Sequence, residues 1–118
     1  MEPAELCQKV LKLEPHIRYS GILNSRGDIV YETNKDDSDI MLTEDEVKMS
    51  IHYTFQRWTS VQNLAHRIGK EKTNISEFDK VTLISLLLNN GSLLLLSSEP
   101  GANYMEIISK VKQIIPDE

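Results

Sequence analysis

A helical period of hydrophobic positions dominates the middle of this chain of 118 residues. Between residues 47 and 68, core-type positions recur every three or four residues. They are Val47, Ile51, Thr54, Phe55, Trp58, Val61, Ala65 and Ile68. Thr43 and Glu46 have the spacing of a capping box, Leu42 and Val47 that of a hydrophobic staple, and Gly69 can end the helix. The pattern predicts one helix of about 25 residues with this face on the core.

Two other stretches have the pattern of β-hairpins. In residues 16–33, Ile17, Tyr19, Gly21 and Leu23 alternate with a second set of positions before the turn NSRGD, where Gly27 can take a left-handed conformation. Residues 80–98 hold two runs of Leu and Ile around an Asn-Asn-Gly-Ser turn. These two runs do not alternate with polar residues, which indicates strands that are buried on both faces.

The remaining segments complete the predicted fold. Residues 3–13 and 105–115 favour helices, the second one stopping at Pro116, and residues 72–78 favour a short strand. A sheet buried on both faces needs a layer of helices on each side. We therefore expect a single α+β domain over residues 1–118, ordered α-β-β-α-β-β-β-α. The long middle helix should cover one face of the sheet, and the first and last helices the other.

Composition narrows the class of partner. The net charge of -5 argues against nucleic acid, which attracts clustered Lys and Arg. Asn89, Asn90 and Gly91 break the apolar run at 83–98 before it reaches the roughly 20 residues of a membrane span, so we expect no membrane insertion. Cys7 is the single cysteine, and no secretory signal pattern opens the chain, which together favour a cytoplasmic protein.

The sequence signals for metal binding and catalysis are weak. Asn34, Asp36 and Ser38 have the spacing of calcium ligands, but Asp39 stands where such a loop needs Gly, and Asp45 where it needs Glu. His16, His52 and His66 have no metal-ligand spacing, and RGD at 26–28 is explained by the hairpin turn. We therefore expect no enzyme activity, no cofactor and no metal.

The long helix carries a second group of apolar positions away from its core face. Met49, Tyr53 and Leu64 are interspersed with Arg57, Ser60 and Arg67. These residues either widen the core stripe or form a surface that meets another helix, because apolar anchors among Arg and Tyr suit an interface. The short strand at 72–78 adds to the second interpretation, since an unprotected edge strand pairs readily with another chain.

Two segments and the long helix between them carry a family resemblance. GILNSRGDIVYE and VTLISLLLNNGSLLLLSSEP resemble the roadblock/longin group of profilin-like domains. More narrowly, IRYSGILNSRGDIV and DKVTLISLLLNNGSLLLLSSEP are similar to a domain family of ammonia-oxidising archaea. The resemblance implies a five-stranded antiparallel sheet, and a homodimer made through the middle helix and the neighbouring edge strand. It also implies a non-catalytic platform for small GTPases or larger regulatory complexes.

Two functions from different classes remain open. The first is a cytoplasmic protein-interaction module that forms a homodimer. Its expected interface comprises Met49, Tyr53, Gln56, Arg57, Ser60, Leu64, Arg67, Asn74 and Ser76. The alternative is a small-molecule sensor, which would need a cavity with convergent polar groups beside Trp58 or Phe55.

Overall fold

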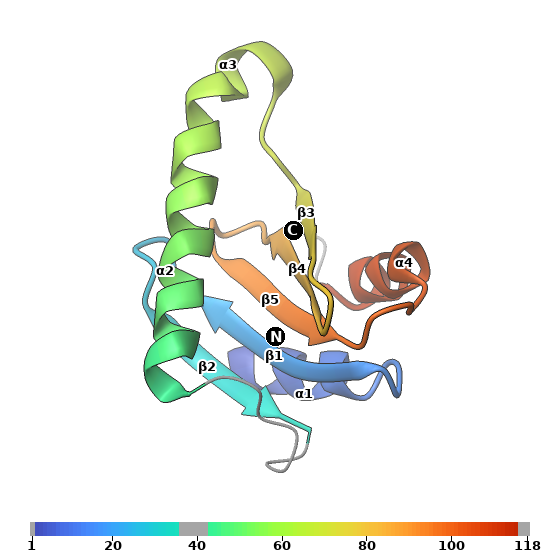
Figure 1. The fold of residues 1–118 in the computed structure, drawn as a ribbon. Helices are drawn as coiled ribbons and strands as arrows, with labels where there is room; N and C mark the ends of the chain where they lie inside the picture. Colours follow the sequence, from blue (N-terminus) through green and yellow to red (C-terminus); the bar gives the residue numbers. More distant parts are fainter. Residues whose placement is uncertain (1, 36–42, 116–118) are drawn as a thin grey trace.

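Five strands form one antiparallel sheet in the computed structural model, which describes residues 2–35 and 43–115 (Figure 1). Their order across the sheet is β2-β1-β5-β4-β3. The strands are β1 (Ile17–Leu23), β2 (Ile29–Asn34), β3 (Thr73–Glu77), β4 (Thr82–Leu87) and β5 (Leu93–Ser98). The helices are α1 (Pro3–Leu11), α2 (Glu44–Val61), the 3-10 turn η2 (Gln62–Leu64), α3 (Ala65–Ile68) and α4 (Tyr104–Ile114). The staple residue Leu42, the stop at Pro116 and most of the calcium-like linker lie outside the described residues.

Helices cover both faces of the sheet, as the pattern predicts. On one face α2 packs on Leu23, Leu93 and Leu95, and on the other α1 and α4 pack on Ile84, Leu94 and other residues of a larger cluster (Figure 1). Every residue of β5 is buried, and most of β4 is. The predicted fold class and the two-sided burial of the second hairpin are therefore confirmed.

The start of α2 follows its sequence signal. The Thr43 hydroxyl accepts a hydrogen bond from the Glu46 amide at 3.2 Å, and the Glu46 carboxylate accepts one from the Thr43 amide at 2.9 Å. These two bonds satisfy amides that the first helical turn leaves without partners. The predicted capping box is therefore present.

The predicted helix of about 25 residues is not continuous, and this is a correction. After α2 ends at Val61, η2 makes one 3-10 turn before α3 closes at Gly69, whose φ is 87° and whose amide bonds to the Ala65 carbonyl. Asn63 has a low helix propensity, and this stretch has little packing to compensate for it. The three- to four-residue spacing of apolar positions therefore continues to Ile68, while the helix changes from α to 3-10 geometry and back.

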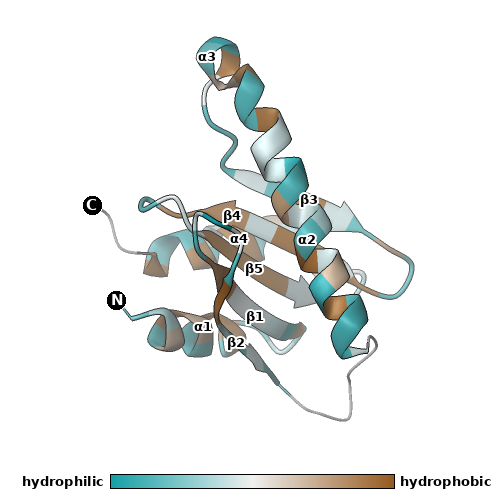
Figure 2. Cartoon of the chain, turned by 90° about the vertical axis from the view of Figure 1, so that its left-hand side faces the viewer, coloured by the Kyte–Doolittle hydropathy of each residue, from teal (hydrophilic) through white to brown (hydrophobic). Residues whose placement is uncertain are grey.

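Ile68 is a second correction, because it is 80% exposed where the helical period placed it on the core. The reason is the course of the helix. α2 crosses one face of the sheet from the β2 side towards β3, and α3 extends past that edge (Figures 1 and 2). The core-facing side of the helix at Ile68 therefore lies beyond the last strand of the sheet.

The alternation in β1 also differs from the prediction at one end. The pairing of β1 with β5 shifts register between Ile17 and Tyr19. Tyr19 and Leu23 pack in the cluster beneath α2, whereas Ile17 packs in the cluster beneath α1 and α4. A β-bulge inserts an extra residue and inverts the face that follows, so Ile17 does not share a face with Tyr19.

Candidate functional site

The predicted interface residues of the long helix are exposed along one stripe. Met49, Tyr53 and Leu64 are 55%, 60% and 53% exposed, which excludes the interpretation that they widen the core. The outer stripe is defined here as Met49, Tyr53, Gln56, Ser60, Leu64 and Arg67, all exposed. Their spacing of three or four residues keeps them on one side of the helix, away from the buried Ile51 and Trp58. Large apolar side chains that alternate with polar ones are typical of a protein interface.

Arg57 connects the helix to the chain that leads into β3. Its guanidinium donates two hydrogen bonds to the Glu71 carboxylate, at 2.8 and 2.6 Å. The hydrogen bonds to the Glu71 carboxylate raise the pKa of Arg57, which keeps the ion pair in its charged form. Both side chains are partly exposed, so the contribution to stability is modest. Its structural effect is to hold the end of α2 over the β3 side of the sheet.

β3 is an edge strand whose side chains on the α2 side are only half-buried. Within the described residues it pairs with one neighbour, β4, and Asn74 lies opposite Ser85. The Ser85 hydroxyl in turn accepts a hydrogen bond from the Trp58 indole nitrogen at 2.9 Å. Asn74 and Ser76, the two predicted interface residues of this strand, are joined by a 3.2 Å side-chain hydrogen bond. The last turn of α2 and the first half of β3 therefore lie at the same level of the molecule.

The nine predicted residues do not form one compact cluster. Met49 and Tyr53 lie on the half of α2 that covers its own sheet, whereas Leu64 and Arg67 lie on η2 and α3, beyond β3 (Figure 1). Arg57, Asn74 and Ser76 lie between these two ends. The site is thus an extended surface along a helix and a strand edge, which suits a macromolecule better than a small ligand.

The space beside Trp58 is occupied by side chains. Trp58 is 3% exposed and belongs to a cluster with Ile51, Leu93 and Leu95, against which Phe55 also packs. A sensor domain would need room and convergent polar groups here. The hydrogen bond to Ser85 instead satisfies the one polar atom of the indole. This packing gives the sensor hypothesis no support.

The sequence predicts neither a metal site nor membrane insertion. Among residues 2–35 and 43–115, no group of three His, Cys, Asp or Glu side chains is placed to hold a metal ion. No helix in the same ranges is long and apolar enough to cross a bilayer. Cys7 is buried, and burial raises the pKa of its thiol, which makes it a weak nucleophile.

Ile68 is the interface candidate that sequence reasoning missed, because its helical period assigned it to the core. The exposure of Ile68 could have been inferred from the length of the predicted helix and the width of the predicted sheet. A helix of about 25 residues measures about 37 Å, whereas the outer strands of a five-stranded sheet are about 19 Å apart. The end of such a helix can pass the edge of the sheet, so its last apolar residues need another cover.

Solved structures share this fold at low sequence identity. A roadblock/LC7 domain from Streptomyces avermitilis superposes with a TM-score of 0.74 at 13% identity, covering 94% of this chain and 89% of that one. The gliding protein MglB from Thermus thermophilus gives 0.75 at 13%, covering 94% and 81%. A structure described as MglB with tetrameric arrangement gives 0.76 at 13%, covering 94% and 80%.

The comparisons of sequence found no match. No family model matches the chain, and no curated protein matches it. The resemblance to a domain family of ammonia-oxidising archaea therefore stays a prediction. The shared structure is the finding, and it shows that the chain has a roadblock/longin-like fold.

Proposed function

We propose that this chain is a non-catalytic, cytoplasmic protein-interaction module that forms a homodimer through the long helix and the edge strand β3. The observation that carries the proposal is the exposure of Met49, Tyr53 and Leu64 on a helix that passes the open edge of its own sheet. Exposed apolar side chains in a row and an edge strand are both costly features for a solitary molecule. One partner that pairs at β3 covers both.

The spacing of the outer stripe suits an antiparallel pair of helices. Tyr53 and Leu64 lie at nearly equal distances on either side of Trp58, and so do Gln56 and Ser60. In a two-fold dimer centred at this level, Tyr53 faces the partner's Leu64, and Gln56 faces the partner's Ser60. A two-fold interface requires such self-complementarity, because each contact occurs twice.

One of the structural neighbours supports self-association. This neighbour is described as having a tetrameric arrangement, so this fold is compatible with assembly from copies of one chain.

As a partner beyond the second copy we propose a small GTPase or a larger regulatory complex, which the roadblock resemblance implies. A dimer would offer it a surface that is built from both copies, so that loss of the dimer would also weaken this binding. Affinity purification from the native cell with wild type and with Tyr53→Glu tests this, and the same GTPase recovered equally by both would contradict it.

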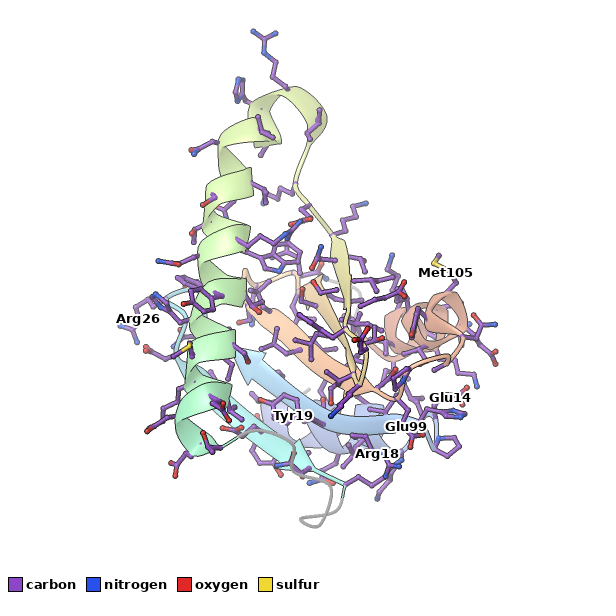
Figure 3. All side chains as sticks on the ribbon, in the orientation of Figure 1. Glu14, Arg18, Tyr19, Arg26, Glu99 and Met105 are labelled. Carbon is purple, nitrogen blue, oxygen red and sulfur yellow. The ribbon has the colours of Figure 1, made fainter. Side chains whose placement is uncertain are left out.

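The test of the dimer is a comparison of oligomeric states. We expect wild type to sediment as a dimer at about 50 µM, a concentration at which even a micromolar complex is formed. The Tyr53→Glu, Leu64→Glu variant should sediment as a monomer, because charges buried in an interface without partners are strongly unfavourable. Met105→Glu is the matched control, since Met105 is 69% exposed on α4 at the other face of the sheet (Figure 3). A wild-type monomer at this concentration would contradict the proposal.

A further inference from the structure

The strand at the other edge of the sheet is also open. In the strand order β2-β1-β5-β4-β3, β2 lies opposite to β3, and within the described residues it pairs with β1 alone (Figure 1). Helix α1 covers one of its faces, where the Gln8 side chain donates a hydrogen bond to the Tyr31 hydroxyl at 2.9 Å. Four of its six residues are nevertheless exposed. Pairing between copies at β3 would leave this strand free.

The hydrogen bonds of β2 show which backbone groups face outward. The Lys35 amide donates to the Arg18 carbonyl of β1 at 2.9 Å. Inward and outward residues alternate in an antiparallel pair, so Thr33 also turns its backbone groups to β1. Glu32 and Asn34 therefore turn an N–H and a C=O each to the open edge. These groups are the template on which a further strand can pair.

The usual protection of an edge strand is incomplete in β2. Proteins block such edges with proline, lysine or a bulge. Residues 29–34 contain neither proline nor lysine, and the bulge affects only the first residues of the strand. Lys35, the next residue, is held on the β1 side, because its ammonium donates to the Glu14 and Pro15 carbonyls at 3.1 and 3.0 Å. The second half of β2 is thus available for pairing.

The charge around this edge is negative. Glu32 is exposed, and its carboxylate accepts a hydrogen bond from the Tyr19 phenol. Val47 packs against the same cluster as Tyr19, so the first turn of α2 lies on this side of the sheet. That turn carries three acidic residues, Glu44, Asp45 and Glu46. A second copy of β2 would bring like charges together, whereas a strand with Lys or Arg would neutralise them.

We propose that the outer edge of β2 binds an extended segment of another protein that is rich in Lys or Arg, and that this segment joins the sheet as a further strand. Backbone pairing with Glu32 and Asn34 supplies the hydrogen bonds, and the exposed Ile29 and Val30 supply apolar contacts at one end. Val30 to Asn34 spans about 13 Å, so the bound segment has about five residues. The proposal does not depend on the homodimer, because β2 and β3 lie at opposite edges of the sheet.

Binding of synthetic peptides tests the proposal. The probe is a short peptide of alternating Lys and Val with blocked ends, and two comparison peptides replace its Lys by Glu or its central Val by Pro. Titration of the isotope-labelled chain with the Lys peptide, followed by NMR, should shift the amide signals of Glu32 and Asn34 and protect them from hydrogen exchange. The comparison peptides should produce neither effect, since one is repelled by the edge and the other lacks a donor for pairing.

Two exposed positions offer matched variants. Glu32→Lys reverses the charge on β2, and Glu77→Lys makes the same change on β3, at the other edge. We expect Glu32→Lys to weaken binding of the Lys peptide about tenfold or more, and Glu77→Lys to leave it unchanged. Glu32→Pro removes an N–H that faces outward, so it should block binding while the circular dichroism spectrum stays that of wild type.

Several outcomes would overturn the proposal. They are absence of binding of the Lys peptide at about 1 mM, shifts confined to β3, and equal binding of the Lys and Glu peptides. A change in the sedimentation of Glu32→Pro would assign the edge to another copy of this chain and would overturn it as well. The Tyr53→Glu, Leu64→Glu variant tests the homodimer separately, so the failure of either proposal can be told from the failure of the other.

Discussion

At the scale of single residues, the hydrogen bond from Trp58 to Ser85 joins the helix to the sheet between two buried side chains. Ser85→Ala removes the acceptor and leaves the indole N–H buried without a partner. We expect a loss of about 1–3 kcal/mol in the free energy of unfolding, measured by urea denaturation. Ser109→Ala, at an exposed position of α4, should change it by less than about 0.5 kcal/mol. Equal effects of the two substitutions would show that the bond does not stabilise the fold.

Gly27 combines two demands that the sequence reveals only in part. Its φ of 88° is the left-handed conformation that the turn pattern predicts. A Cβ added there would also lie 2.8 Å from the ring of Phe55 on α2, a contact that no local pattern contains. The hairpin turn therefore fits directly against the long helix.

Alanine substitutions separate these two demands. Gly101 has a similar φ of 84° and open space around it, so Gly101→Ala should cost about 1 kcal/mol through backbone strain alone. Gly27→Ala should cost about 2–4 kcal/mol, because strain and overpacking add. Urea denaturation of both variants measures the difference. Equal losses would mean that Phe55 moves aside at no cost.

At the scale of elements, the sequence predicts features that depend on neighbouring residues better than features that depend on the rest of the sheet. The capping box at Thr43 and Glu46 and the left-handed glycines at 27, 69 and 91 are set by neighbouring residues, so the sequence contains them. Whether Ile68 is buried or exposed depends on how far the sheet extends beneath the helix. That distance depends on strand order, which comes from pairing between residues far apart in the chain.

The same distinction explains β1. Its alternation was predicted correctly from Tyr19 to Leu23, where the strand pairs regularly with β5. Ile17 was placed on the wrong face, because the bulge before Tyr19 depends on register with β5, about 80 residues away in the chain. The candidate interface shows the same limit. The helical period placed Met49 and Tyr53 away from the core face but left open whether they are exposed, and the half-buried face of β3 could not be predicted.

At the scale of the whole molecule, ion pairs join segments that are distant in sequence. The Lys110 ammonium of α4 contacts the Glu14 carboxylate, which follows α1, at 2.5 Å, and Arg18 of β1 pairs with Glu99, which follows β5 (Figure 3). The hydrogen bond from Lys110 holds the pKa of Glu14 below its ordinary value, and the one from Arg18 does the same for Glu99. The first pair joins α4 to the segment that follows α1, and the second joins β1 to the segment that follows β5. The carboxylates of both pairs lose their charge in acid.

The lowered pKa of Glu14 predicts how stability depends on pH. A carboxyl with a lower pKa in the folded than in the unfolded chain binds fewer protons when folded, so its stabilising effect is complete above the ordinary pKa of 4.5. That effect is lost as the pH falls through the folded-state pKa. Lys110→Gln removes the main cause of the shift. We therefore expect this variant to be less stable than wild type at pH 7, and the difference to shrink steadily as the pH falls below 4.5.

Urea denaturation of wild type and Lys110→Gln from pH 7 down to about pH 3 measures this convergence. Lys9→Gln is the matched control, because Lys9 and Glu5 form a looser pair on α1, 3.7 Å apart, with both side chains more than half exposed. Surface pairs of that kind contribute little, so its curve should run close to that of wild type throughout. A constant gap between wild type and Lys110→Gln over the whole range would mean that Lys110 stabilises the protein through the packing of its aliphatic stem on α4. The charge on Glu14 would then contribute nothing to the union of the two segments.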